Sequence, residues 1–332
     1  MVIFRRMVVS AFFCLTASAA WASNFRAADL VYMPAAARAA GSGGSFFKTD
    51  VTISNLSTDP VIVSVVLVEG PNGNAAAPAS AVPIPVLAPG ERREIVDILQ
   101  SVLNVSPGNH VGQLLFFACR QGGNCTDCDA NSADCKLIAV QGRIYTEGTG
   151  ASCPAAAGSN TCTFGQLFVG IPWYNFISST SSTQGLDKAF IAGIRQIGTA
   201  GVSGFRSNIG VANASNEFNT TIRIQLFSNT GQLVGTQSIN LGPLGHSQQN
   251  VGTLFPGFTG GGYVIVDQTS STQITTTPAG QSPPVPGFFA YGSVVDNLSN
   301  DPTTLEAVYT DDLSFACVYG SKPVKRPVRK GS

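Results

Sequence analysis

The chain has 332 residues, of which 44% are hydrophobic, 9% aromatic and 11% charged. This length suits about two domains of roughly 150 residues, and the abundance of Gly, Ser, Thr, Asn and Pro favours short strands and turns over helices. Cations and acids balance at 19 each, but seven cations lie in the two termini, which leaves 12 cations against 19 acids in the body. An acidic body without a basic face argues against a nucleic-acid partner.

The first 22 residues have the pattern of a secretory signal peptide. Arg5 and Arg6 precede an apolar stretch, Met7 to Leu15, that is shorter than the roughly 20 residues needed to span a bilayer. Ala20-Trp21-Ala22 fits a cleavage site, and the alternative is a retained anchor helix. We therefore expect an exported protein that is secreted, periplasmic or held at the cell surface.

Two later stretches share one pattern. Phe47–Asn55 (FKTDVTISN) and Phe205–Asn213 (FRSNIGVAN) both run aromatic, cation, small hydroxyl and Asp or Asn, followed by an alternating apolar run that ends in Asn. A period of two is that of a β-strand, so we call these the marker strands. The turn spacing after each copy is also similar, and the duplication predicts an all-β protein of two tandem antiparallel β-sandwiches.

The turns divide the chain into ranges. We expect a first sandwich with a cysteine-rich loop at 23–147, a connector at 148–186, a second sandwich at 187–320 and a basic, disordered tail at 321–332. We expect a flexible loop from Ala35 to Ser45 and a strand at the domain junction from Phe164 to Trp173. In the alignment of the two repeats, Leu244-Gly245-His246 falls without a gap on Pro89-Gly90-Glu91. The other expected strands are Val61–Val68, Arg92–Leu99, Val111–Cys119, Leu137–Tyr145, Lys188–Ile197, Thr221–Phe227, Gly262–Val266 and Phe288–Val295.

Several pieces of the chain resemble the tandem immunoglobulin-like repeat proteins secreted by environmental bacteria. The resemblance reaches to about Leu305 and implies immunoglobulin-like sandwiches, export, and a spacer, adhesive or display role. The cysteine-rich loop departs from the usual pattern of these proteins. Besides the marker strands, the matching pieces are Met33–Arg38 with the Gly-Ser-Gly-Gly that follows nearby, Phe164–Gln166, Gly170–Pro172, Gly193–Gln196, Ser293–Asn297 and Asp301–Thr303.

Seven cysteines follow the leader, and an exported chain oxidises its thiols, so disulfides are favoured. One pair flanks strands expected to be antiparallel neighbours, where a bridge across the loop mouth is natural. A zinc site built from the first four cysteines is the alternative, but a second C-x-x-C is missing. The candidate pairs are Cys119 with Cys135 and Cys153 with Cys162. In addition, either Cys125 pairs with Cys128, or one of these two pairs with Cys317.

The same loop carries oxygen ligands at alternating positions, as at the start of a calcium loop. These weak candidates are Asp127, Asp129, Asn131 and Asp134. However, a serine takes the place of the usual glycine, and the closing glutamate is replaced by isoleucine. A polar surface loop is the favoured interpretation, and no cofactor is expected.

The sequence offers little for catalysis. His110 and His246 are the two histidines, each beside a turn or strand end, and neither belongs to a nucleophile motif. Ser203 lacks the spacing of a nucleophile elbow. We therefore expect a protein that is not an enzyme.

Polar residues repeat between the marker strands. Asp50 and Asn208 are equivalent, as are Lys48 and Arg206, so they form either paired binding sites or, as we favour, polar strand positions that satisfy neighbouring backbone. The glycosylation-type triplets that begin at Asn55, Asn213 and Asn297 are interpreted as turns.

The function predicted from these features is that of a non-catalytic surface or extracellular module for adhesion, display or ligand binding through loops. A cell-surface polymer, a glycan or another protein would be the partner, and the tail from Lys322 could contact an anionic polymer or merely solubilise the chain. The first alternative is a subunit that polymerises by strand addition, with the segment after Ala22 as donor. The second alternative is an enzyme with an unrecognised site.

Overall fold

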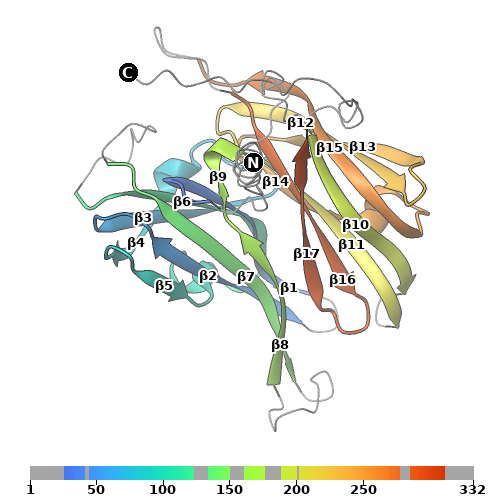
Figure 1. The fold of residues 1–332 in the computed structure, drawn as a ribbon, viewed down its shortest axis with the longest axis horizontal. Helices are drawn as coiled ribbons and strands as arrows, with labels where there is room; N and C mark the ends of the chain where they lie inside the picture. The colour runs from blue at the N-terminus through green and yellow to red at the C-terminus, as the bar shows by residue number, and fades with distance from the viewer. Residues whose placement is uncertain are drawn as a thin grey trace, which may run out of the picture.

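The computed structural model describes residues 26–41, 45–122, 134–149, 161–175, 188–199, 202–276 and 285–310. The predicted signal peptide (1–22) and basic tail (321–332) lie outside these ranges. The described chain is almost entirely β and forms two antiparallel nine-strand units, which confirms the predicted all-β sandwich fold (Figure 1). Among the described residues, no helix is both long and apolar enough to cross a membrane.

The first unit has the strand order β4-β3-β6-β1-β2-β7-β8, with β5 paired to β2 and β9 to β1. A short helix, α2, and two 3-10 turns, η2 and η4, complete it. Its elements are β1 (Leu30–Ala40), β2 (Phe46–Asn55), β3 (Val61–Glu69), η2 (Ala77–Ser80), β4 (Val82–Leu87), β5 (Arg92–Ile95), α2 (Ile98–Ser101), β6 (Asn109–Arg120), β7 (Ile138–Thr149), β8 (Thr161–Val169), β9 (Ile171–Pro172) and η4 (Trp173–Asn175).

The second unit repeats this order as β13-β12-β15-β10-β11-β16-β17, with β14 paired to β11 and β18 to β10. Every strand of the first unit therefore has a counterpart, and the duplication predicted from the marker strands, β2 and β11, extends through the whole unit. Its elements are β10 (Lys188–Thr199), β11 (Ser203–Asn213), β12 (Phe218–Ser228), β13 (Leu233–Leu241), β14 (His246–Asn250), α3 (Val251–Leu254), β15 (Gly260–Gln273), β16 (Phe288–Asp296), β17 (Pro302–Glu306) and β18 (Val308–Thr310).

A bulged first strand joins the two layers of each sandwich. β1 pairs with β6 over most of its length but meets β2 at its end, where Ala40 faces Phe46. The register shifts between Met33 and Ala36 in β1, and it shifts in the same way between Ile191 and Ile194 in β10. A bulge bends a strand and increases its twist, which allows the strand to pass from one layer to the other.

The alternating apolar residues of the marker strands point into the cores. Val51 and Ile53 of β2 are buried in the first core, and Ile209 and Val211 of β11 are buried in the second. Burying such side chains stabilises the fold by about 1.5–3 kcal/mol each.

The small hydroxyl of each marker strand ties down the bulged neighbour. Thr49 Oγ1 accepts the Ala37 N–H at 2.8 Å and donates to the Ala37 carbonyl at 2.9 Å. Ser207 Oγ makes the same two contacts with the backbone of Arg195, both at 2.8 Å. A bulge leaves backbone groups without ladder partners, and a buried hydroxyl satisfies them here.

The asparagines of the glycosylation-type triplets are buried turn residues, as predicted. Asn55 Nδ2 donates to three backbone carbonyls, and its Oδ1 accepts the Ser57 N–H at 2.9 Å. Asn213 Nδ2 donates to two carbonyls, and its Oδ1 accepts the Ser215 N–H at 3.0 Å. Asn297 is also buried and donates to two backbone carbonyls. Amides held in this way are inaccessible in the folded protein.

One expected loop was wrong. Ala35 to Ala40, predicted as the first part of a flexible loop, belongs to β1, and four of its alanines are almost fully buried. Alanine has a low strand propensity by itself, so sequence pattern favours a loop. Strand β1 forms because it pairs with β6 over most of its length and with β9 and β2 near its two ends.

Two further boundaries differ from the prediction. The strand expected from Arg92 to Leu99 ends at Ile95, because Asp97 has a φ of 44° and begins α2. The ungapped alignment of the repeats is also one residue out, since Arg92 pairs with Ser54 where His246 pairs with Ala212. A helical start cannot be read from a short apolar run by periodicity alone.

The segment expected as a connector contributes strands to the first sandwich. β8 pairs with β7 along its length, and β9 pairs with β1 at Val31 and Tyr32. Figure 1 shows β8 beside β17 of the second unit, where Thr304 Oγ1 donates to the Leu167 carbonyl at 2.6 Å. The strand predicted at the domain junction is therefore present.

A third apolar cluster joins the sandwiches. Val66 and Val68 of β3 and Tyr32 of β1 pack there with Leu244 and Phe289 of the second unit. The end of β3 is therefore buried on a second face by this junction. An interface of this apolar kind is expected to limit relative motion of the sandwiches.

Backbone contacts strengthen the junction. Gly242 N–H donates to the Pro71 carbonyl at 2.7 Å, and His246 N–H donates to the Gly70 carbonyl at 2.8 Å. A Cβ at Gly245 would lie 2.2 Å from the Pro71 oxygen, so this turn needs glycine for the close approach. The two units therefore meet through main chain as well as side chains.

The segment proposed as a polymerisation donor is already used. β1 pairs with β2, β6 and β9 of its own chain. Polymerisation through this segment would require copies to exchange β1, because it is not a free strand added to a vacant edge.

Candidate functional site

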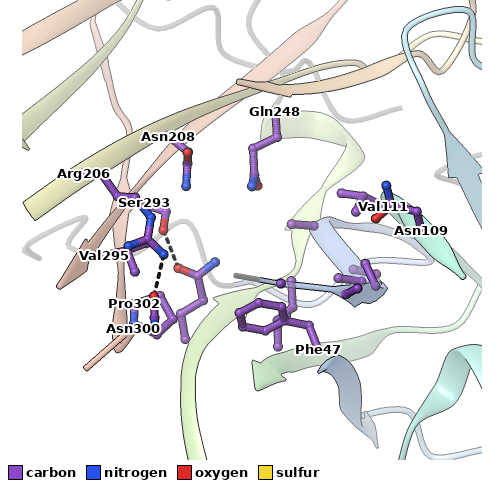
Figure 2. A pocket seen from close by; sticks show the side chains of 18 residues that line it. Phe47, Asn109, Val111, Arg206, Asn208, Gln248, Ser293, Val295, Asn300 and Pro302 are labelled. Atoms are coloured by element: carbon purple, nitrogen blue, oxygen red, sulfur yellow. Dashed lines mark hydrogen bonds between the residues drawn. The ribbon is translucent and has the colours of Figure 1, made fainter. Parts of the chain in front are cut away.

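A cavity of about 340 Å³ lies between the two sandwiches. Its walls come from β1, β2, β6, β7 and β8 on one side and from β11, β14, β16 and β17 on the other (Figure 2). Small-molecule sites in proteins typically have volumes of about 300–1,000 Å³ and often lie at domain interfaces. This cavity is the candidate functional site.

The wall contributed by the first sandwich is largely apolar. Ala35, Ala36 and Ala39 of β1 line it together with Phe47 of β2 and Ile144 of β7. The alanines are packed and nearly fully buried, whereas Phe47 is half-buried. The short side chains of β1 leave space here that larger residues would fill.

The wall contributed by the second sandwich is polar. Arg206 and Asn208 come from the marker strand β11, and Gln248 and Ser293 come from β14 and β16. Figure 2 shows Arg206, Asn208, Ser293 and Asn300 on one side of the cavity and Phe47 away from them. The site therefore has one apolar and one hydrogen-bonding face.

Arg206 is the one charged side chain among the residues that line the cavity. Its two terminal nitrogens donate to amide oxygens, at 3.1 Å to Asn297 Oδ1 and at 2.9 Å to Asn300 Oδ1. Partial burial lowers the pKa of the guanidinium from its ordinary value, while the charge of Asp296 acts in the opposite direction. The cation is thus held by neutral partners in a partly desolvated place.

Ser293 and Gln166 connect the sandwiches at the cavity. Ser293 Oγ donates to Gln166 Oε1 at 2.8 Å, and both side chains are buried. Their partners are neutral, so the hydroxyl of Ser293 is not activated by a base within this pair. The contact fixes β8 against β16 beside the polar wall.

A buried hydrogen-bond chain lies behind Gln248. The Tyr291 hydroxyl donates to Gln248 Oε1 at 2.8 Å and lies 2.9 Å from His246 Nε2, which therefore donates to it. Burial lowers the pKa of His246 to about 4 and raises that of Tyr291. Both rings are neutral near pH 7, and neither of them lines the cavity.

The second predicted histidine is elsewhere. His110 of β6 lies 3.1 Å from Glu69 through Nδ1, and both side chains are partly exposed. His110 does not line the cavity either.

The equivalent polar residues of the two marker strands differ in position and partner. Asp50 Oδ1 accepts the Asp97 N–H at 2.9 Å and so satisfies neighbouring backbone as predicted, whereas Lys48 pairs with the Glu147 side chain at 3.2 Å. Their counterparts Arg206 and Asn208 line the cavity. The sequence comparison identified these positions but not the wall that they form.

The repeats also differ in charge around these positions. In the first sandwich, Arg38 forms a buried ion pair with Asp97. The strand registers and helix caps place Gln196 and Asn250 at the corresponding points of the second. Asn250 Nδ2 donates to the Ser207 carbonyl at 3.1 Å and lies 3.4 Å from Asn208 Oδ1. Amides thus replace a charged network beside the cavity.

Two of the candidate cysteines face one another. Cys119 and Cys135 form an isolated antiparallel bridge, flanked by backbone hydrogen bonds from Arg120 N–H to Asp134 O and from Lys136 N–H to Ala118 O. The cysteines therefore occupy a non-hydrogen-bonded pair, in which side chains lie close together. Cys162 is in β8, while Cys125, Cys128, Cys153 and Cys317 lie outside the described residues.

The predicted calcium ligands fall mostly outside the described ranges. Asp127, Asp129 and Asn131 are not among the described residues, and Asp134 forms an ion pair with Arg120 at 3.1 Å. In the described part of the chain, no cluster of three or more His, Cys, Asp or Glu side chains could hold a metal ion.

Comparisons with known proteins add little. No family model matches the chain, and no curated protein is similar to it. Among solved structures, a chain from the work titled "Crystal structure of the T13 IBDV viral particle reveals a missing link in icosahedral viruses evolution" aligns with 11% identity over 86% of this chain and 70% of that chain. The TM-score is 0.20, which is too low to bear on fold or function.

Proposed function

We propose that the protein is a non-catalytic extracellular binding module whose ligand site is the cavity between its two sandwiches. The observation that carries the proposal is a cavity of about 340 Å³ with an apolar wall from one repeat and a polar wall from the other. A site built by two packed units is held in shape before the ligand arrives, which reduces the cost of binding. The sequence-based expectation placed binding on loops, and the cavity is the better-supported place.

The chemistry of the lining favours binding over catalysis. Its polar side chains are amides, one hydroxyl and one guanidinium, and it includes no carboxylate, imidazole, amine or thiol. General acid–base catalysis in enzymes relies mostly on those missing groups. Ser293, the one hydroxyl, donates to a neutral amide.

Export through the predicted leader is part of the proposal. It rests on the pattern of Arg5, Arg6 and the Ala20-Trp21-Ala22 site, and on the resemblance to secreted repeat proteins. An oxidising compartment would also permit a disulfide between Cys119 and Cys135. Their opposed positions in a non-hydrogen-bonded pair support this bond, because Cα atoms there are about 4.5 Å apart and disulfides span about 4.4–6.8 Å.

The test is a ligand screen with a blocked cavity. Glycans and small metabolites are screened against the exported chain by thermal shift and ligand-observed NMR. Asn109 is exposed and lines the cavity, so Asn109→Trp should cover the opening without disturbing a core. The control is Thr259→Trp, at the corresponding exposed position of the second sandwich, outside the cavity lining.

We expect at least one compound to bind the wild-type protein and the Thr259→Trp variant but not Asn109→Trp. Binding that persists in Asn109→Trp would place the ligand on another surface. Turnover of a screened compound by the wild-type protein would show that the module is catalytic.

A further inference from the structure

Arg206 lines the cavity without an acidic partner. Within the described ranges, its hydrogen bonds go to Asn297 and Asn300, and it forms no ion pair. The neighbouring Asp296 is already engaged, since its Oδ1 accepts the N–H groups of Leu298 and Ser299 and the Ser299 hydroxyl. A partly desolvated cation whose direct hydrogen-bond partners are neutral amides is stabilised by an incoming anion.

The geometry of the guanidinium suits a carboxylate. Arginine has five N–H groups, and only two from Arg206 reach protein acceptors among the described residues. A carboxylate can accept a pair of parallel N–H groups from one guanidinium, which gives both affinity and direction. The amides of Asn297 and Asn300 hold the fork in place for such a contact.

The second repeat has amides at two positions where the first repeat has acids. Lys48, the counterpart of Arg206, is paired with Glu147, and Asp50 stands where the second repeat has Asn208. A site for a cation would benefit from carboxylates at these positions. The second repeat has amides instead, and Arg206 is the one charge among the described residues that line its cavity, which favours an anion over a cation.

The opposite wall determines the rest of the ligand. The ring of Phe47 lies across the cavity from Arg206, and the alanines of β1 add apolar surface to the lining. Asn208 Nδ2 and the amide nitrogen of Gln248 have no protein acceptor in the described part of the chain, and both residues line the cavity. These donors can serve hydroxyl or carbonyl groups of a ligand.

We infer that the cavity binds a small organic carboxylate with one apolar face, its carboxylate on Arg206 and its apolar face on the alanines of β1 and Phe47. The inference rests on the proposed binding function and names the chemical class of the ligand. Two sources share this chemistry: a uronic acid, whose ring has a face of C–H groups, and an aromatic acid.

The experiment is titration calorimetry of the exported chain with glucuronate, benzoate and uncharged glucose. Arg206→Gln removes the cation, and Arg206→Lys keeps the charge but removes the fork. The matched control is Lys48→Gln, the same loss of charge at the equivalent position of the first repeat, outside the cavity. Asn109→Trp is designed to obstruct the cavity, and circular dichroism tests whether each variant is folded.

We expect glucuronate or benzoate to bind, with glucose at least tenfold weaker. Arg206→Gln should weaken the carboxylate at least tenfold, Arg206→Lys to a smaller extent, and Lys48→Gln less than twofold. Preference for glucuronate would identify the sugar acid, and preference for benzoate the aromatic acid.

Two results would overturn the inference and are distinguishable from each other. If a neutral sugar binds as well as the acids, and only Asn109→Trp abolishes binding, the cavity is a binding site but not for carboxylates. If neither acid binds the wild-type protein, and the broad screen also finds no compound sensitive to Asn109→Trp, then the proposed function fails together with the inference.

Discussion

His246 donates through Nε2 to the hydroxyl of Tyr291 at 2.9 Å, and the two rings stack at the buried junction of the sandwiches with a centroid separation of 6.2 Å. The hydroxyl in turn donates to Gln248, which lines the cavity. A neutral imidazole is therefore part of a hydrogen-bond chain within the second unit that ends at the cavity lining.

This contact predicts that acid destabilises the protein before its carboxylates titrate. Burial lowers the pKa of His246 from 6.5 to about 4, so the unfolded chain takes up a proton that the folded chain excludes. Stability should fall as the pH falls from 6.5 towards 4, by up to about 3 kcal/mol. Urea denaturation between pH 7 and 4.8 measures this slope.

The variant that tests this prediction is His246→Gln, which should abolish most of the slope in that pH range. Asp59, Glu91 and Asp296 have lowered pKa values, so the stability that they contribute is lost only at lower pH. An unchanged slope in His246→Gln would contradict the prediction.

The hydroxyls that fasten the bulged strands should contribute equally in both repeats. Thr49→Val and Ser207→Ala each leave a buried backbone N–H without its acceptor, which costs about 1–3 kcal/mol. The sites lie in different sandwiches and share no partner, so the double variant should lose the sum. Denaturant titration measures each loss, and Thr52→Val, on the half-buried face of β2, is the control.

A much smaller loss for one hydroxyl would show that the repeats do not use this device equally. In that case the bulge of the less affected repeat must be held by its core packing alone.

The bridge of Cys119 to Cys135 predicts one particular disulfide. Non-reducing peptide mapping of the exported protein should recover these two residues in one linked pair. Closing a loop of about 15 residues stabilises a fold by about 3 kcal/mol, so Cys119→Ser and Cys135→Ser should each lower stability by about that amount. The double variant should lose no more than either single one.

Recovery of Cys119 linked to Cys125 or Cys128 would contradict this pairing. The cysteines would then be opposed in the sheet without being bonded to each other.

The duplication was visible in the sequence because its signal is local. The period-two pattern of Val51 and Ile53, and of Ile209 and Val211, follows directly from alternate burial along a strand. Thr49 and Asn55 repeat as Ser207 and Asn213 because the same backbone groups need partners in both sandwiches.

The cavity could not be predicted because its walls are brought together only by the junction. Phe47 is the first residue of one marker strand and Arg206 is the second residue of the other. The two motifs are far apart in the sequence, and nothing local places one residue opposite the other. The alanines of β1 were also missed, because a run of small residues has the composition of a loop. The change from Asp50 to Asn208 was visible, but its meaning depends on the cavity.

The place of β1 predicts a monomer. Leu30–Ala40 pairs with β6, β9 and β2 of its own chain and contributes to the first core, so this strand is not free to pair with a neighbouring copy. Light scattering of the oxidised protein beginning at Ser23 should give the mass of one chain. Removing residues 23–40 should unfold the first sandwich. The deletion takes Val31 and Met33 out of the first core and exposes the apolar residues that pack against them. Filaments that disappear on this trimming, while the remaining chain stays folded, would instead establish exchange of β1 between copies.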